Sequence, residues 1–195
     1  MTDLTAQRRS LSIPNMLTIG RVIAVPLLVS AFYFIEGNLG RWIAFGLFFI
    51  AAASDFLDGY LARAWHQHSA FGKMLDPIAD KLLVGASILM LVYDQTITGS
   101  AIWAAIIILC REILVSGLRE FLAELQVKLH VTWLSKSKTI FQLVAIGLLI
   151  MGPATGEGAT FIGNVGLTLL WVAAFITLWT GYGYTGAAVS EAMRR

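Results

Sequence analysis

The stretch that decides the fold is residues 13–35, IPNMLTIGRVIAVPLLVSAFYFI, in which Arg21 is the single charged residue. A helix of about 20 mostly apolar residues is long enough to cross the hydrocarbon core of a bilayer. Five further stretches have this character, so that the ranges are roughly 13–35, 41–62, 74–93, 100–123, 133–152 and 160–186. Because a helix in lipid satisfies its own backbone hydrogen bonds, we predict an all-α integral membrane protein, a bundle of six transmembrane helices.

The composition agrees with this prediction. Of 195 residues, 57% are hydrophobic and 13% are charged, whereas a soluble domain is usually about 25% charged. The net charge of +2 is too small to indicate a nucleic-acid partner. The connections are short and no Pro- or Ser-rich linker divides the chain. We therefore expect one domain over 1–195, in which residues 1–12 form a short cytoplasmic segment beside the membrane.

Lysine and arginine residues in the connections predict the orientation of the bundle. Cytoplasmic connections carry an excess of these residues. One side of the predicted bundle would hold Arg41 alone. The other side would hold Arg8, Arg9, Arg63, Lys73, Lys128, Lys136, Lys138, Arg194 and Arg195. We therefore predict that both termini, the 63–73 connection and the 124–138 connection are cytoplasmic.

Four aspartates interrupt the second and third predicted spans at this same edge. Asp55 and Asp58 are three residues apart and Asp76 and Asp80 are four apart, so each pair would share a helix face. Clustered carboxylates cannot all stay ionised without cations. Hard oxygen ligands suit Mg²⁺ or Mn²⁺, and two such ions could stabilise both oxygens of a phosphoryl displacement. The alternative is that nearby Lys and Arg side chains neutralise the aspartates at a wet helix end.

The fourth span carries cations that indicate a phosphorylated substrate. It contains the sequence REILVSGLRE at 111–120. Arg111 and Arg119 are eight residues apart and Ser116 lies three before Arg119, which puts the three roughly on one helix face. Arginine binds a phosphate dianion through two parallel hydrogen bonds. The alternative is that Arg111 pairs with Glu112 or another buried acid.

Polar residues at two further span ends would join the same cavity, which we expect to open to the cytoplasm. Lys136 and Lys138 lie where the fifth span leaves the cytoplasmic edge. They either contact the substrate phosphate or only set the topology. Asn15, Thr18 and Arg21 lie at the start of the first span. Arg21 is a full turn inside, so it should line the cavity or extend to the membrane edge.

The aspartates belong to a longer pattern. It reads Asp55-x2-Asp58-Gly59-x2-Ala62-Arg63-x8-Gly72-x3-Asp76-x3-Asp80. This string resembles the signature of the CDP-alcohol phosphotransferase family, and every signature position is matched. The resemblance implies a six-helix membrane enzyme, usually a homodimer, with a two-metal site formed by the four aspartates. It further implies that Asp80 is the general base and that Gly59, Ala62 and Arg63 hold the CDP moiety. From their place at the start of the first span, we expect Asn15, Thr18 and Arg21 to lie on the CDP-diacylglycerol side of the cavity.

Three flanking motifs narrow the resemblance. IPNMLTIGR at 13–21, REILVSGLRE at 111–120 and WLSKSKTIFQ at 133–142 are similar to the bacterial branch of this family whose acceptor is glycerol 3-phosphate. That similarity implies CDP-diacylglycerol and sn-glycerol 3-phosphate as substrates, phosphatidylglycerophosphate and CMP as products, and a bacterial cytoplasmic (inner) membrane as the location.

Other functions stay open on the sequence. Within the family the acceptor could be inositol phosphate, serine or phosphatidylglycerol, and cations in the acceptor pocket would discriminate among these. From another class, an ion-coupled transporter could use buried acids as a relay. The acids of a transporter would be distributed across the membrane, often beside symmetric broken helices, whereas these aspartates cluster at one edge.

Overall fold

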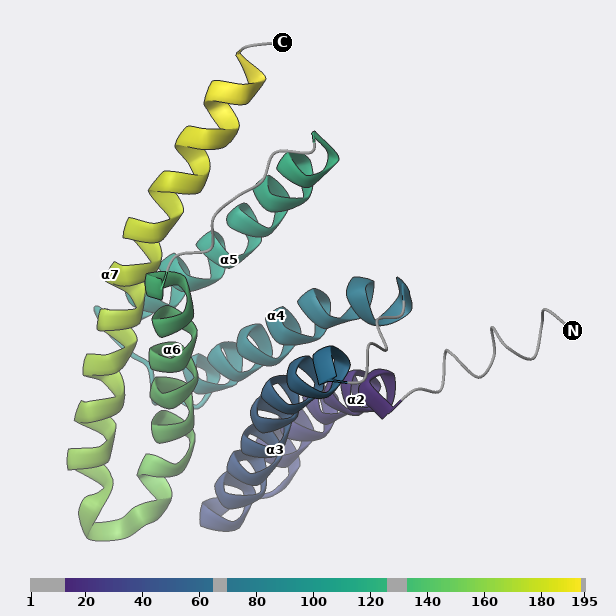
Figure 1. Cartoon of the computed structure of the whole chain (residues 1–195). Coiled ribbons are helices and arrows are strands. Elements are labelled where there is room, and N and C mark those ends of the chain that lie inside the picture. The colour runs from purple at the N-terminus through teal and green to yellow at the C-terminus, as the bar shows by residue number, and fades with distance from the viewer. Residues whose placement is uncertain (1–12, 65–69, 126–132, 194–195) are drawn as a thin grey trace, which may run out of the picture.

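The structure is a computed structural model, and it describes residues 13–64, 70–125 and 133–193 (Figure 1). Within these ranges it leaves out the side chains of 13–14, 56–64, 70–71, 73, 133–136, 187–188 and 191–192. Some predicted features therefore lie outside the described residues. They are the segment 1–12, Lys128, Arg194 and Arg195 and, for their side chains, Asp58, Gly59, Ala62, Arg63, Lys73 and Lys136.

Helices follow one another along the described chain, and these residues contain no strand. The elements are α2 (Ile13–Phe34), α3 (Gly37–Ala64), α4 (Ala70–Tyr93), α5 (Ala101–Glu124), α6 (Trp133–Met151), the 3₁₀ helix η1 (Gly152–Gly158) and α7 (Ala159–Ala192). The prediction of an all-helical protein is confirmed. The helix bounds lie within a few residues of the predicted ranges, except that α7 continues to Ala192.

Three helical stretches of the described residues are long and apolar enough to cross a membrane. They are Asn15–Phe34, Ala101–Glu124 and Ser137–Gly186, the last of which comprises most of α6, all of η1 and most of α7. Large apolar side chains are exposed on these helices, among them Phe161, Phe175 and Trp179. A surface of this kind suits lipid rather than water. By contrast, α3 and α4 contain the aspartates and several basic residues.

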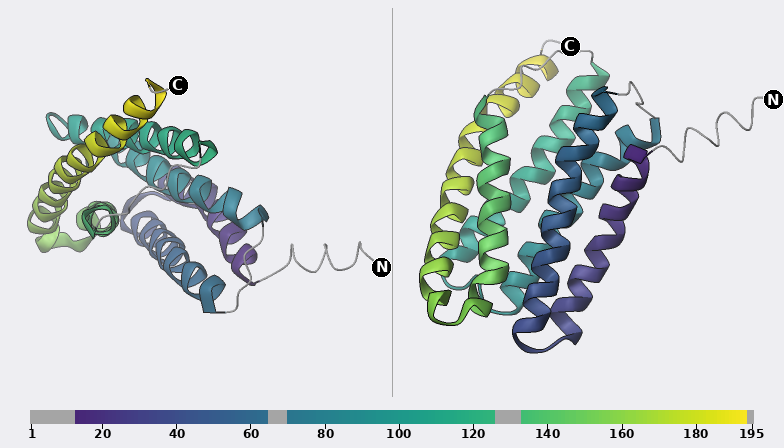
Figure 2. Two further views of the ribbon diagram at one scale, coloured as in Figure 1. Left: turned by 45° about the horizontal axis from the view of Figure 1, so that its top comes forward. Right: turned by 60° about the horizontal axis from the view of Figure 1, so that its bottom comes forward.

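The helices form two groups that meet along α3, α4, α5 and α6. Helix α2 packs on α3 and α4, whereas α7 packs on α5 and α6. Contacts of α3 and α4 with α6, and of α4 with α5, join the two groups. Successive helices alternate in direction, so the start of α2 and the end of α7 lie at the same end of the bundle (Figure 2). The ends of α3 and α5 and the starts of α4 and α6 lie at that end too.

Tight helix connections depend on glycine at the opposite end. Gly37 begins α3 with a φ of 76°, a left-handed conformation that costs glycine little. Three residues on, a Cβ atom at Gly40 would lie 2.1 Å from the carbonyl oxygen of Ile35. Only a residue without a side chain permits this approach, and it lets α3 turn back directly along α2.

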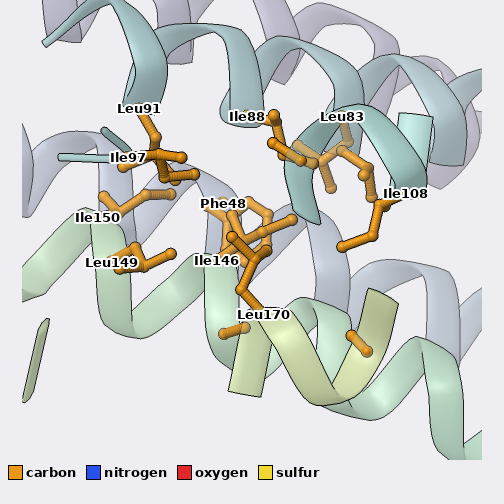
Figure 3. Packing of buried hydrophobic residues seen from close by; sticks show 14 of the residues in the cluster. Phe48, Leu83, Ile88, Leu91, Ile97, Ile108, Ile146, Leu149, Ile150 and Leu170 are labelled. Atoms are coloured by element: carbon orange, nitrogen blue, oxygen red, sulfur yellow. The ribbon is translucent and has the colours of Figure 1, made fainter. Parts of the chain in front are cut away.

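The hydrophobic core lies between the two groups of helices. Phe48 of α3, Leu83 of α4 and Ile108 of α5 contribute to one continuous cluster with residues of α6 and α7. The labelled side chains in Figure 3 are Phe48, Leu83, Ile88, Leu91, Ile97, Ile108, Ile146, Leu149, Ile150 and Leu170. Close packing of this cluster fixes the rotation of each helix about its axis. It thereby fixes which polar side chains face one another at the end where the chain begins and finishes.

A polar cluster joins the helices at the other end of the bundle. Arg41 of α3 donates hydrogen bonds from Nη2 to Asp94 Oδ2 at 2.6 Å and to Thr96 Oγ1 at 2.9 Å. From Nη1 it donates to the Ile150 carbonyl at 3.2 Å, and its guanidinium lies 5.9 Å from the ring centroid of Phe32. One side chain therefore connects α2, α3, the α4–α5 turn and α6.

Candidate active site

A cavity of about 450 Å³ opens between the two groups of helices. Its wall is formed by five helices, and the lining residues are Asp55 of α3; Asp76, Pro77, Asp80 and Lys81 of α4; Arg111, Glu112, Val115, Ser116, Arg119, Glu120 and Ala123 of α5; Lys138 and Thr139 of α6; and Tyr184 of α7. These positions belong to the late parts of α3, α5 and α7 and to the early parts of α4 and α6. The cavity therefore lies toward the end of the bundle where the chain begins and finishes (Figure 2).

The acidic wall of the cavity comes from α3 and α4. Asp55, Asp76 and Asp80 all line it, as the spacing of the aspartates predicted for neighbouring antiparallel helices. Asp80 lies within electrostatic range of Asp55 across the helix pair. Asp58, the fourth aspartate of the pattern, has its side chain outside the described residues. The structure thus brings three of the four predicted metal ligands to one cavity.

Helix α2 contacts two of these carboxylates through side chains that do not line the cavity. Thr18 donates a hydrogen bond from Oγ1 to Asp76 Oδ1 at 2.6 Å. Arg21 Nη1 lies 2.5 Å from Asp55 Oδ1. Asn15, Thr18 and Arg21 are all buried, and none of them lines the cavity that they were predicted to join. The predicted place of these residues beside a nucleotide stays a prediction, and Thr18 and Arg21 contact Asp76 and Asp55.

The basic wall is built around Arg111 of α5. Its Nε donates to the Thr177 carbonyl at 3.1 Å and its Nη2 donates to Thr180 Oγ1 at 3.0 Å. Gly181 of α7 lies against this side chain, since a Cβ atom there would be 3.4 Å from Arg111 Cγ, an ordinary van der Waals contact. The third nitrogen, Nη1, lies 3.5 Å from Glu112 Oε1. The pairing of Arg111 with Glu112 that the sequence left open is therefore present, and Arg111 also lines the cavity.

Lys138 joins the basic wall from α6. Its ammonium donates a hydrogen bond to Glu112 Oε1, the same oxygen that lies beside Arg111. The Lys138 side chain is only 7% exposed, and burial of a charged group is tolerated only when the charge is paired and hydrogen-bonded. Lys136, one of the two lysines predicted to contact the acceptor, has its side chain outside the described residues.

Ser116 and Arg119 continue the basic wall toward the rim of the cavity, and both line it as predicted from helical spacing. Arg119 is exposed. Among the described side chains it has no ion pair or hydrogen bond with a partner. Its guanidinium therefore keeps its donors available to a bound anion.

Five polar lining residues were not predicted as site residues. They are Lys81, Glu112, Glu120, Thr139 and Tyr184. The sequence could have indicated Glu112, because an acidic residue in an apolar membrane helix is usually functional. Lys81 directly follows Asp80 and had the same kind of signal. Tyr184 is about 45 residues beyond Thr139 in a helix that is apolar on all sides, so no periodicity indicated which face of α7 reaches the cavity.

The acidic wall is suited to divalent cations. Asp55, Asp76 and Asp80 supply the hard carboxylate oxygens that Mg²⁺ and Mn²⁺ prefer. The Asp55 side chain is 41% exposed, and Asp76 accepts a hydrogen bond from Thr18 through Oδ1. Among the side chains that the structure describes, no group of three His, Cys, Asp or Glu residues is already in a metal-binding arrangement. The Asp58 side chain lies outside the described residues. The donor chemistry nevertheless fits the cations that the pattern predicted.

The comparisons with known proteins agree on one family. The family model for CDP-alcohol phosphatidyltransferases matches residues 11–179. The chain belongs to the CDP-alcohol phosphatidyltransferase family.

Relatives in several bacteria share one name, CDP-diacylglycerol–glycerol-3-phosphate 3-phosphatidyltransferase. The protein of Rickettsia felis is 45% identical over 89% of this chain and 93% of its own length. That of Haemophilus influenzae is 41% identical over 91% of this chain and 93% of its own. That of Cereibacter sphaeroides is 37% identical over 89% and 93%. The likeness therefore extends over almost the whole of each protein.

Proposed function

We propose that this protein transfers the phosphatidyl group from CDP-diacylglycerol to sn-glycerol 3-phosphate, with phosphatidylglycerophosphate and CMP as products. The observation that carries the proposal is the shared cavity, in which signature aspartates from α3 and α4 face cations from α5 and α6. Relatives at 37–45% identity carry the name of the enzyme for this reaction, which supports the proposal. An acidic wall suits a nucleotide diphosphate held through cations, and a basic wall suits a phosphorylated acceptor.

The proposed setting is a bacterial cytoplasmic membrane that six helices, α2 to α7, cross. The excess of Lys and Arg in one set of connections supports cytoplasmic termini and a cavity that opens to the cytoplasm. The acyl chains of CDP-diacylglycerol would stay in the bilayer while its nucleotide enters the cavity. Two copies of the chain would form a homodimer, as the family resemblance implies.

Asp55, Asp58, Asp76 and Asp80 would hold two divalent cations, Mg²⁺ or Mn²⁺. When bound, such ions supply charge stabilisation to the oxygens of the phosphoryl group in transfer. The protein's part is to keep the carboxylates in place before substrate arrives. The contacts of Thr18 with Asp76 and of Arg21 with Asp55 serve this purpose.

The remaining chemistry falls to side chains of the two walls. Asp80 takes the proton from the primary hydroxyl of glycerol 3-phosphate. That oxygen forms a bond to the β-phosphorus, the bond from this phosphorus to the bridging oxygen breaks, and CMP leaves. Gly59, Ala62 and Arg63 contact the CDP moiety. Positioning of both substrates in one cavity makes the transfer effectively intramolecular.

The basic wall selects the acceptor. Arg111, Ser116, Arg119 and a lysine from 136 or 138 hold its phosphate. Of these, Arg119 is exposed and Lys138 and Arg111 are buried, which suits a phosphate that enters past Arg119 and finishes beside the inner pair. An acceptor without a phosphate, such as serine, would form no ion pair with these cations.

The test is an acceptor panel with purified protein and CDP-diacylglycerol, scored by the lipid product and by release of CMP. Glycerol 3-phosphate should give phosphatidylglycerophosphate, and inositol phosphate, serine and phosphatidylglycerol should give little product. Asp80→Asn is nearly isosteric and should lower kcat by at least about 10²-fold, the lower end for general acid–base catalysis. A panel in which another acceptor is preferred would refute the proposed acceptor. Undiminished turnover by Asp80→Asn would refute the assigned base.

A further inference from the structure

Glu112 occupies an unusual place for an acid. It lies on the basic wall of the cavity, where its Oε1 accepts the hydrogen bond from Lys138 and lies 3.5 Å from Arg111 Nη1. Its side chain is 16% exposed. None of the roles proposed above for the cavity uses this carboxylate. A largely buried acid that lines the cavity without a role in it needs an explanation.

The helices on either side of this carboxylate have little direct contact. Helix α7 packs extensively on α5 and on α6, whereas α5 and α6 are not among the helix pairs with substantial packing. The pair of Glu112 and Lys138 therefore spans the gap between α5 and α6. Without it, the long Lys138 side chain would have several rotatable bonds and no hydrogen-bond partner among the described side chains to select one position.

The Glu112 carboxylate also offsets the repulsion between two neighbouring cations. Lys138 and Arg111 lie close enough to repel each other. Two like charges in a poorly solvated place are costly unless an opposite charge lies between them. Glu112 supplies that charge in the resting protein, so both cations can stay at the cavity before a substrate arrives.

We propose that Glu112 is a positioning residue for the acceptor phosphate. It holds the Lys138 ammonium and the Arg111 guanidinium side by side at the inner end of the basic wall, in the arrangement that a phosphate dianion requires. This inference rests on the proposed function, because it gives Glu112 its role through the acceptor. It predicts that Glu112 affects the acceptor and leaves CDP-diacylglycerol alone.

The experiment measures KM for both substrates, kcat and the apparent Tm of Glu112→Gln, with Glu124→Gln as the matched control. Glu124 ends the same helix, is exposed and does not line the cavity. Glu112→Gln should raise KM for glycerol 3-phosphate by about tenfold or more, the effect of losing a charge-assisted hydrogen bond. KM for CDP-diacylglycerol should change by less than about twofold. Glu124→Gln should change neither value.

Two further variants separate positioning from a general structural role. Glu112→Asp keeps the charge and should restore part of the affinity for glycerol 3-phosphate. Lys138→Met should raise the same KM, and adding Glu112→Gln to it should raise KM by less than the product of the two single effects, because Glu112 acts partly through Lys138. Multiplicative effects would overturn the inference.

Each remaining outcome has a distinct meaning. An unchanged KM for glycerol 3-phosphate in Glu112→Gln would refute the positioning role, and a lowered KM would show that the carboxylate competes with phosphate instead. Equal losses for both substrates, or a fall in Tm that accounts for the lost activity, would make Glu112 structural only. If the unsubstituted protein does not use glycerol 3-phosphate at all, the proposed function fails first, and the wild-type acceptor panel reveals that independently.

Discussion

The two arginines of α5 should respond differently to removal, although the sequence makes them look alike. Arg111 is buried and makes three polar contacts: with the Thr177 carbonyl at 3.1 Å, with Thr180 Oγ1 at 3.0 Å and with Glu112 at 3.5 Å. Arg119 lies at the rim and is exposed. We therefore expect Arg111→Ala to lower the stability of the fold and Arg119→Ala to leave it unchanged.

The expected size follows from these contacts. Hydrogen bonds to a charged group contribute about 1.5–3 kcal/mol, and loss of one partner of a buried ion pair costs about 3–5 kcal/mol. Because Lys138 still pairs with Glu112 in the variant, we take about 3 kcal/mol for Arg111→Ala. For a chain of this length that corresponds to a fall in Tm of roughly 6–12 °C. A substitution at an exposed site such as Arg119 changes stability by less than about 0.5 kcal/mol.

The assay is thermal unfolding of both variants in the same detergent and at the same heating rate, since unfolding of membrane proteins is commonly irreversible. Initial rates at a temperature well below both transitions then give KM for glycerol 3-phosphate, which should rise in both variants. Arg111→Lys is the conservative control, because an ammonium cannot reproduce the three contacts of a guanidinium. It should recover only part of the lost Tm. Equal Tm values for Arg111→Ala and Arg119→Ala would refute the structural role assigned to Arg111.

Three other predictions concern metal, topology and the far end of the bundle. Excess EDTA should abolish turnover and CDP-diacylglycerol binding, and Mg²⁺ or Mn²⁺ should restore both. Binding of glycerol 3-phosphate should persist in EDTA. Full turnover in the chelator would rule out the metal site. Ser100 and Glu124 are exposed at opposite ends of α5. In a Cys110→Ser background, a single cysteine at either position should react with an impermeant thiol reagent, and the two positions should react from opposite sides of the membrane. Labelling of both from one side would contradict the proposed crossings. Arg41→Ala should lower the free energy of unfolding by about 2–3 kcal/mol through loss of its bond to Asp94 while both KM values stay unchanged, and a changed KM would connect the two ends of the bundle.

The sequence predicted the helices well because their signal is local. Each apolar stretch is long enough to be recognised by itself. The observed bounds of α2 and α5 differ from the predicted ranges by no more than one residue at either end. The family signature was equally readable, since its eight positions lie within 26 consecutive residues. The faces of α3 and α4 followed from that spacing, and the structure brings Asp55, Asp76 and Asp80 to one cavity accordingly.

Contacts between distant helices could not be predicted in the same way. Thr18 and Asp76 are 58 residues apart, and Arg111 and Thr180 are 69 apart. Such pairs depend on how each helix is rotated about its axis. In lipid that rotation leaves little trace in the sequence, because both the core and the outer surface are apolar. Helix α7 shows the difficulty most clearly: it is apolar on all sides, yet its Gly181 accommodates Arg111 and its Tyr184 lines the cavity.

The distribution of charge explains why the two substrates should depend on metal to different degrees. The wall from α3 and α4 carries Asp55, Asp76 and Asp80. Asp55 also pairs with Arg21 of α2, which does not line the cavity. A nucleotide diphosphate brought against this wall adds negative charge to negative charge, so its binding is unfavourable unless cations lie between them. The opposite wall carries three cations against Glu112 and Glu120, and it can accept a phosphate dianion directly. CDP-diacylglycerol should therefore need divalent cations merely to bind, whereas glycerol 3-phosphate should need them only to react.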